Sequence, residues 1–158
     1  MASPEPMSQV TQLFAHDLTV GLTFSGEPVT LSPEHFSGFA ALTGDKHPIH
    51  YDAAFAATTQ FKRPVAHGLL LTSLTALGAT AFSTSLENAM VALVEQQMRF
   101  LHPAFVGDVV TPHFEVISNR PLADGRRAIV ELSVRLSNQD GAHILEGRHV
   151  YLLRRTST

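Results

Sequence analysis

The sequence predicts an α+β fold in which an antiparallel β-sheet is wrapped around a long central helix. The second half of the chain holds four stretches rich in β-branched and aromatic residues, separated by turn residues, at positions 90–101, 109–118, 127–136 and 144–153. Short turns between consecutive strands favour an antiparallel sheet. Residues 64–86 contain no Asp, Glu, Lys or Arg, so a helix there needs apolar cover on most of its sides.

The first half of the chain begins with two short segments of strand character, residues 22–24 and 29–31. Ser32 followed by Pro33 is a typical helix start, because a hydroxyl group caps the first turn and proline is pre-organised for it. We expect this helix to run from Pro33 to about Leu42 and to end at Gly44.

A loop over residues 45–50 is expected next, followed by a second helix over residues 52–58 with Asp52 as its cap. Arg63-Pro64 interrupts the pattern, and the uncharged central helix is predicted to begin near His67. Leucines cover much of its circumference, which favours burial inside the protein. Seven Ser and Thr residues between positions 72 and 85 argue against a membrane span.

Along residues 129–136 polar and apolar side chains alternate, which predicts one solvent-facing and one buried face of the sheet. The uncharged helix is the cover that the buried face needs, and a sheet curled around such a helix is called a hotdog fold. We expect a disordered lead-in over residues 1–10 and a single domain over residues 11–158. The lead-in has no apolar segment of the kind that signal peptides carry.

Composition argues against several classes of function. The formal net charge is −3 and the eleven Lys and Arg residues are scattered, so binding to nucleic acid is not expected. The chain has no cysteine, which agrees with a reducing compartment, and we expect a cytoplasmic protein without membrane contact. Charged residues make up only 16%, so part of the surface is expected to be buried in a homodimer or a dimer of dimers.

Asp45 and His50 form the pattern with the clearest chemistry. Gly44 precedes the pair and Pro48 stiffens the chain between its members. A carboxylate and an imidazole on one short loop can lie on either side of a single water and share its protons. We therefore take Asp45 and His50 as candidate catalytic residues.

The residues around this pair resemble the motif of the MaoC-like, or R-specific enoyl-CoA hydratase, family. The motif has an aromatic residue, Leu, Thr or Ser, then Gly-Asp-x-Asn-Pro-aliphatic-His and a later small residue; the matching positions are Phe39, Leu42, Thr43, Gly44, Asp45, Pro48, Ile49, His50 and Ala56. Residues 61–70 and the Pro-x-x-x-Gly-Asp turn at 103–108 are also similar to the family. His47 stands where the family has Asn, so an imidazole must supply the hydrogen bonds of that amide.

The resemblance implies hydration of a trans-2-enoyl thioester to an (R)-3-hydroxyacyl thioester, or the reverse dehydration. The expected substrate is an acyl-CoA or an acyl-carrier-protein thioester, and neither a metal nor a redox cofactor is expected. Asp45 and His50 would hold and activate a water. Gly68 opens the central helix, where a free N–H polarises the thioester carbonyl and the missing Cβ leaves room for it.

The resemblance also implies roles for other residues near this pair. Substrate contacts are expected from His47, Arg63 and His67, with Arg63 near the phosphates of coenzyme A. Some family members carry a serine of the central helix close to the site, and the hydroxyl residues of the corresponding turn are Thr72, Ser73 and Thr75.

Several alternatives stay open. Asp45, His47 and His50, joined by His67, are also a set of metal ligands, although their spacing matches no metal signature. His67 has a structural alternative, in which a ring N–H bonds a carbonyl at the turn into the helix, and Arg63 is alternatively part of a solvated turn. The hotdog fold also serves acyl-CoA thioesterases, and His47 keeps open a non-catalytic subunit that binds acyl thioesters.

Overall fold

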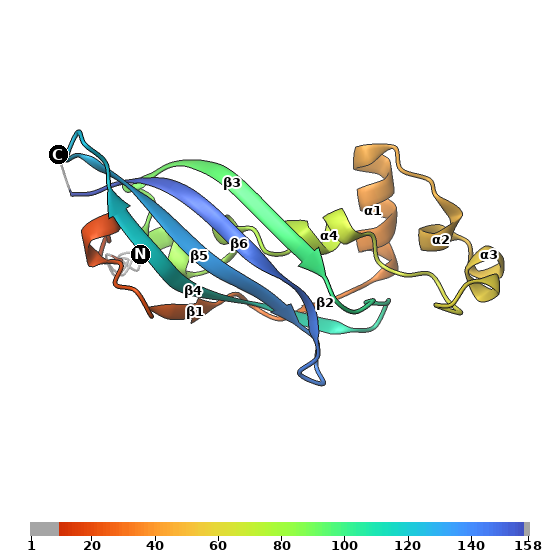
Figure 1. Ribbon diagram of the computed structural model, residues 1–158. Coiled ribbons are helices and arrows are strands. Elements are labelled where there is room, and N and C mark those ends of the chain that lie inside the picture. The colour runs from red at the N-terminus through yellow and green to blue at the C-terminus, as the bar shows by residue number, and fades with distance from the viewer. Residues whose placement is uncertain (1–9, 157–158) are drawn as a thin grey trace, which may run out of the picture.

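The computed structural model describes residues 10–156, in which helices occupy the middle of the chain and long strands follow (Figure 1). The first half contains the 3-10 helix η1 (Ala15–Asp17), strands β1 (Thr23–Ser25) and β2 (Val29–Thr30), and helices α1 (Pro33–Thr43), α2 (Pro48–Tyr51) and α3 (Ala53–Thr58). The second half contains α4 (Gly68–Ser73), the 3-10 helix η2 (Leu77–Ala79), α5 (Phe82–Ser85), β3 (Met90–Phe100), β4 (Val109–Pro121), β5 (Arg127–Ser137) and β6 (His143–Arg154). Apart from Val10, the predicted lead-in lies outside the described residues.

The strands form an antiparallel sheet in the order β1-β4-β5-β6-β3, and β2 pairs with β4. Its four long strands coincide with the four predicted stretches, which confirms the expectation of an antiparallel sheet. Two of the hairpins turn at Gly125 and Gly141, whose φ angles of 65° and 78° lie in the left-handed region that glycine enters without steric cost.

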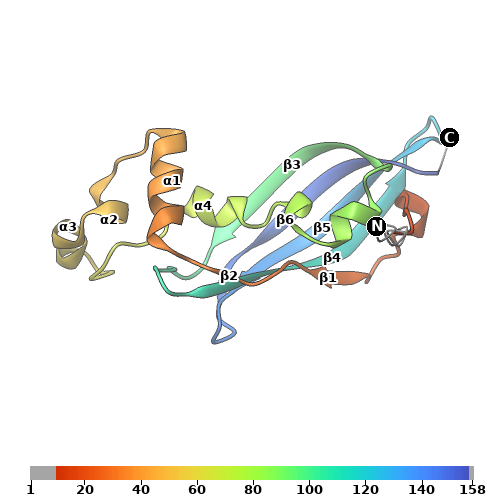
Figure 2. The same cartoon turned by 180° about the vertical axis from the view of Figure 1, so that it is seen from behind.

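Strand β5 shows how the sheet acquires a buried face. Its alternate apolar residues from Val130 to Leu136 are 0% to 3% exposed, whereas the residues between them are partly or fully exposed. Leu77 and Leu86, from the segment before β3, belong to the same buried cluster as Val130. Segments α4, η2 and α5 therefore cover this face, as predicted (Figures 1 and 2).

The prediction of one long central helix is wrong, because the uncharged segment is divided into α4, η2 and α5. Hydroxyl groups along it donate to the backbone carbonyl three residues earlier, at Ser73, Thr75, Thr80, Ser83, Thr84 and Ser85. Such side-chain bonds stabilise isolated turns that compete with a regular helix. Within residues 10–156, no helix has both the length and the apolar character needed to cross a membrane.

Helices α1, α2 and α3 lie beyond one end of the sheet (Figures 1 and 2). As predicted, α1 begins after Ser32, whose backbone N–H donates to Nδ1 of His35 at 3.0 Å. It ends at Gly44, which has a φ of 75°. Helix α3 begins after Asp52, whose carboxylate accepts hydrogen bonds from the first turn. These caps place the Asp45 segment between two well-defined helices.

A buried polar network connects β6 to β3. His149 is 1% exposed, its Nε2 lies 2.8 Å from the amide nitrogen of Gln96, and its Nδ1 lies 3.1 Å from the hydroxyl of Tyr151. Both ring nitrogens of His149 thus have polar partners inside the protein. Burial lowers the pKa of His149 to about 4 and raises the pKa of Tyr151 to about 12. Both side chains are therefore neutral at pH 7.

We expect His149 to make the fold less stable as the pH falls from 6.5 to 4. The pKa of His149 is lower in the folded protein than its ordinary value of 6.5, so the unfolded chain takes up a proton first and acid favours unfolding in this window. His149→Phe removes this proton uptake. Urea unfolding at several pH values should show a shallower pH dependence in the variant, and an equal slope would contradict the assignment.

Candidate active site

Short hydrogen bonds at the end of α1 fix the position of Asp45. The Thr43 hydroxyl donates to the Phe39 carbonyl at 2.7 Å and accepts from the Asp45 N–H at 3.2 Å. The Asp45 carboxylate then accepts a hydrogen bond at Oδ1 from the N–H of His47 at 2.9 Å. This arrangement leaves Oδ2 for a partner from another part of the chain.

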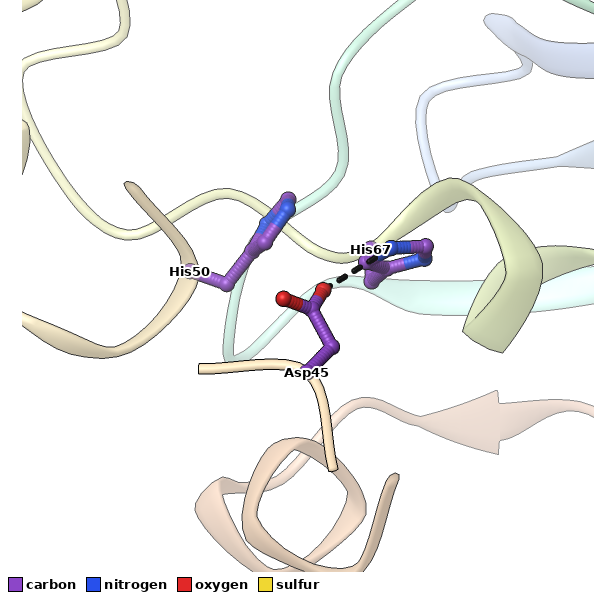
Figure 3. A group of neighbouring side chains, drawn as sticks. All are labelled: Asp45, His50 and His67. Atoms are coloured by element: carbon purple, nitrogen blue, oxygen red, sulfur yellow. Dashed lines mark ion pairs between the residues drawn. The ribbon is translucent and has the colours of Figure 1, made fainter. Parts of the chain in front are cut away.

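That partner is His67, which caps the N-terminus of α4. Its Nδ1 accepts from the Leu69 N–H at 3.0 Å, and its Nε2 lies 3.0 Å from Oδ2 of Asp45 (Figure 3). Because Nδ1 accepts, the proton of the neutral ring resides on Nε2 and is donated to Asp45. The structural role expected of His67 at the helix start is confirmed. Its predicted partner, a backbone carbonyl, is wrong, because the ring N–H bonds the carboxylate of Asp45.

His50 lies on the one-turn helix α2, so the prediction that residues 45–50 form a loop is wrong from Pro48 onward. Pro48 occupies the first helical position, where its fixed φ is pre-organised. Nδ1 of His47 accepts from the Ile49 N–H at 3.3 Å and caps this turn. Histidine is not a typical cap, so the sequence did not indicate a helix here.

The carbonyl of Val65 sets the protonation of the His50 ring. Nδ1 of His50 lies 2.7 Å from this oxygen. A carbonyl oxygen can only accept, so Nδ1 carries the proton and the neutral ring has its lone pair on Nε2. His50 is thus prepared to act as a base through Nε2, in contrast to His67, which donates from that atom.

Asp45, His50 and His67 converge from three segments of the chain and form what we call the site trio (Figure 3). One carboxylate oxygen of Asp45 and one ring nitrogen of each histidine lie within 4.8 Å of one another. A single water can bridge groups at such separations with two ordinary hydrogen bonds. The geometry therefore fits the expectation that Asp45 and His50 act on one water.

The same groups fit a metal site poorly. His67 has no lone pair to offer, since Nδ1 accepts from Leu69 and Nε2 carries the proton given to Asp45. Nδ1 of His47 is engaged by the backbone N–H of α2, and both oxygens of Asp45 already accept hydrogen bonds. This donor pattern favours acid–base chemistry over metal binding.

Asp45 is the charged member of the trio at neutral pH. The hydrogen bond from the His47 N–H is the largest influence and lowers the pKa of the Asp45 carboxyl. Burial opposes it as the second-largest influence, and the neighbouring His67 and His50 lower the pKa further. Burial, together with His50, lowers the pKa of His67 and keeps it a neutral donor. The side chains of His67 and Asp45 are 24% and 27% exposed, so a ligand can reach them.

Gly68 is the first residue of α4 and directly follows His67. Its N–H has no hydrogen-bond partner within residues 10–156, which fits the expected donor to a thioester carbonyl. The space of the missing Cβ is filled by the ring of Phe100, because a Cβ there would lie 2.9 Å from its Cζ. The expectation that this space is open for substrate is therefore wrong. The glycine lets the end of β3 pack against the start of α4.

The side chains of His47 and Arg63, the other expected substrate contacts, form no hydrogen bond with the trio among the described residues. The His47 ring caps α2, so an imidazole replaces a capping amide at this position. The centroid of the His47 ring is 6.2 Å from that of the His50 ring. The Arg63 guanidinium lies 3.9 Å from the centre of the Phe105 ring and forms no ion pair with a described residue. It is exposed, and thus available to an anion.

Two groups near the trio were not predicted from the sequence. The carbonyl that orients His50 comes from Val65, and a backbone group leaves no residue signature. Tyr51 follows His50 directly, and its buried hydroxyl has no partner among the described residues. Burial, followed by the charge of Asp45, raises the pKa of Tyr51. The sequence signal for Tyr51 was its position directly after His50.

Comparisons with known proteins support the fold and the resemblance. The chain is 38% identical over 117 residues to an (R)-specific enoyl-CoA hydratase of Aeromonas caviae, covering 74% of this chain and 82% of that relative. It is 34% identical over 122 residues to a 3-hydroxybutyryl-CoA dehydratase of Methylorubrum extorquens, covering 77% and 74%. A Mycobacterium tuberculosis protein with a double hotdog fold, 20% identical, matches with a TM-score of 0.77 over 94% of this chain and 46% of its own. The hotdog fold is thus confirmed.

A family model described as a MaoC like domain matches residues 18–137. This region contains the whole site trio and the strands from β1 to β5. The chain therefore belongs to the MaoC-like domain family.

Proposed function

We propose that this protein is a hydro-lyase that adds water to a trans-2-enoyl thioester and gives an (R)-3-hydroxyacyl thioester, or catalyses the reverse dehydration. One observation carries the proposal. An ionised Asp45 lies close to His50, and the Nε2 lone pair of His50 is free. The names of the two enzyme relatives, a hydratase and a dehydratase of CoA thioesters, support the same reaction and favour an acyl-CoA over an acyl-carrier-protein substrate.

In this proposal Asp45 positions the water and His50 moves its proton. The Asp45 carboxylate accepts a hydrogen bond from one O–H of the water, while Nε2 of His50 removes the other proton as the oxygen bonds to C3. The electron pair of the double bond moves toward the thioester oxygen. When it returns, C2 takes the proton from His50, so the ring ends as it began.

His67 and Gly68 support this step from the start of α4. His67 donates to Asp45 and holds the carboxylate in place, so it is a positioning residue. The Gly68 N–H donates to the thioester oxygen, on which negative charge develops. Loss of one such donor typically costs about 3 to 4 kcal/mol of transition-state stabilisation. Arg63, exposed on its turn, is placed by this proposal near the phosphates of coenzyme A, and His47 beside the substrate.

The test follows the enoyl absorbance of crotonyl-CoA mixed with purified protein, with chiral analysis of the product. Loss of absorbance with formation of the R alcohol supports the proposal. Release of free thiol would instead identify a thioesterase. Saturable binding of CoA esters without any change in them, across a panel of chain lengths, would identify a non-catalytic binding subunit.

We also propose that the protein is a homodimer joined through β3. This strand stands at the end of the sheet order, so its outer backbone edge is unpaired within the described residues. Val91, Leu93 and Val94 on it are 46%, 50% and 51% exposed, and an exposed apolar edge strand favours association. Light scattering on the eluting protein should give twice the chain mass of 17.1 kDa. A monomer mass at micromolar concentration would contradict the proposal.

A further inference from the structure

Arginine side chains gather at the end of the sheet opposite the site trio. Five of the eleven Lys and Arg residues lie at or next to the ends of β4, β5 and β6 that meet there: Arg120, Arg126, Arg127, Arg154 and Arg155. Helices α1 to α3 occupy the other end of the molecule (Figures 1 and 2). Cations that are scattered along the sequence are thus concentrated by the fold, in a chain whose formal net charge is −3. Such a concentration attracts anions.

Three of these arginines line a hollow of about 1250 Å³, which we call the arginine hollow. Its wall consists of Val91, Asp124, Arg126, Arg127, Arg154 and Thr156. Arg127 and Arg154 are register partners on β5 and β6, so their side chains lie on the same face of the sheet. Like charges directly opposite each other destabilise a sheet, and an anion bound between them would remove that cost.

The charges of the hollow do not cancel. Asp124 is the one acidic residue in the wall. Its Oδ2 accepts from Nε of Arg127 at 2.7 Å, and its Oδ1 accepts from the backbone N–H of Arg126 and of Arg127 at 2.9 and 3.1 Å. Arg126 and Arg154 are exposed and form no ion pair within residues 10–156. The excess of two positive charges suits a phosphate monoester, which guanidinium groups bind well.

The arginine hollow lies too far from the site trio of its own subunit to hold the same CoA molecule. Strand β3 connects the two places, because Val91 near its start lines the hollow and Phe100 at its end packs against Gly68. Eleven residues of strand extend over roughly 30 Å. The pantetheine arm, which joins the thioester sulfur of CoA to its phosphates, is much shorter.

The proposed homodimer brings the hollow of one subunit to the trio of the other. A two-fold axis that crosses β3 pairs it antiparallel with its copy and places the start of each β3 beside the end of the other. Neighbouring strands are about 5 Å apart, and β6 is the strand next to β3 in the sheet. The β6 strand of the partner, with Arg154 at its end, thus lies roughly 10 Å from the Phe100 end of β3.

We propose that the arginine hollow binds the 3′-phosphate of a CoA thioester whose acyl group is held by the site trio of the partner subunit. The inference rests on the proposed function and on the proposed homodimer. The 3′-phosphate is the monoester of CoA and carries close to two negative charges at pH 7, which matches the excess in the hollow. Each active site is then complete only when both subunits are present.

The first test compares crotonyl-CoA with 3′-dephospho-crotonyl-CoA, which lacks only this phosphate. The wild type should show a KM about tenfold higher for the dephospho ester, as loss of a charge-assisted hydrogen bond allows. Its kcat should be unchanged, because the phosphate is remote from the reacting carbons. Arg126→Gln/Arg154→Gln should raise the KM of crotonyl-CoA by a similar factor and leave the KM of the dephospho ester as it is.

The matched control is Arg120→Gln/Arg155→Gln. It removes two positive charges from the same end of the sheet, but neither residue lines the hollow. The control should keep the wild-type ratio of the two KM values. A control that loses the ratio as fully as Arg126→Gln/Arg154→Gln would show a diffuse effect of charge and overturn the assignment to the hollow.

A mixed dimer tests which subunit the hollow serves. One subunit carries Asp45→Asn and the other carries Arg126→Gln/Arg154→Gln, each with its own affinity tag for purification. If the hollow serves the partner, one site of this dimer combines an intact trio with an intact hollow. The mixed dimer should then show the wild-type KM for crotonyl-CoA at about half the wild-type kcat. The raised KM of the arginine variant would instead overturn binding across the dimer.

The outcomes separate this inference from the proposed function. Equal KM values for the two esters in the wild type overturn the inference, while hydration of crotonyl-CoA still supports the hydratase. An equal rise for both esters in Arg126→Gln/Arg154→Gln also overturns it, because the arginines would then meet another part of CoA. A monomer mass has the same consequence. If crotonyl-CoA is not hydrated at all, the proposed function fails and the inference fails with it.

Discussion

Asp45→Asn is expected to lower the rate of crotonyl-CoA hydration by about 10²- to 10⁴-fold, the usual range for a lost acid–base group. The amide is isosteric but neutral, so it cannot accept from the water, His47 and His67 as the carboxylate does. The initial rate of absorbance loss at saturating crotonyl-CoA, divided by the enzyme concentration, gives kcat. Asp52→Asn is the control, because Asp52 caps α3 and Asn is an equally good cap. A near wild-type rate for Asp45→Asn would end the assignment.

His50→Gln should cause a loss of similar size. The Gln amide can still donate to the Val65 carbonyl, as Nδ1 of His50 does, but it offers no basic nitrogen to the water. His102→Gln is a matched control, since Nδ1 of His102 bonds the His143 carbonyl at 2.7 Å in the same way and lies on another loop. Equal rates for the two variants would show that His50 is not the proton carrier.

The largest expected loss of stability comes from Gly147→Ala on β6. Gly147 pairs with Met98 of β3, and a Cβ at this position would collide with the backbone oxygen of Gln97 and lie 2.6 Å from the Met98 sulfur. A backbone atom cannot yield as a flexible side chain does. We expect the free energy of unfolding to fall by about 3 kcal/mol, at the upper end of overpacking effects.

Urea unfolding at fixed protein concentration measures this loss, because association adds to apparent stability. Gly38→Ala makes the same chemical change inside α1, where a Cβ meets nothing within 4 Å. It should stabilise the protein by about 0.5 to 1 kcal/mol, since alanine suits a helix interior better than glycine. Equal shifts for the two variants would rule out the packing explanation.

Most of the fold was predicted from patterns among residues that are close in the sequence. The starts and ends of α1 and α3 follow from Ser32, Gly44 and Asp52, because a cap is a contact between residues close in sequence. The alternation along β5 predicted its buried face for the same reason, as side-chain direction depends only on position in the strand. The candidate pair Asp45 and His50 was visible because both residues lie in one short motif.

The prediction of a long central helix was wrong because a hydropathy pattern does not show where side-chain hydroxyls bond to nearby backbone carbonyls. Residues 64–86 are apolar enough for a buried helix, but the structure buries only part of the segment, and Leu69 is 61% exposed. Their Ser and Thr hydroxyls bond nearby carbonyls and divide the segment into turns.

The sequence by itself determined the fold class, the strands, the helix caps and the identity of the two residues proposed for catalysis. Only the tertiary structure decided that His67 donates to Asp45 and that the Val65 carbonyl leaves the His50 lone pair on Nε2. The first set depends on patterns within a few residues. The second depends on hydrogen-bond partners brought together by packing, which fix ring protonation and charge.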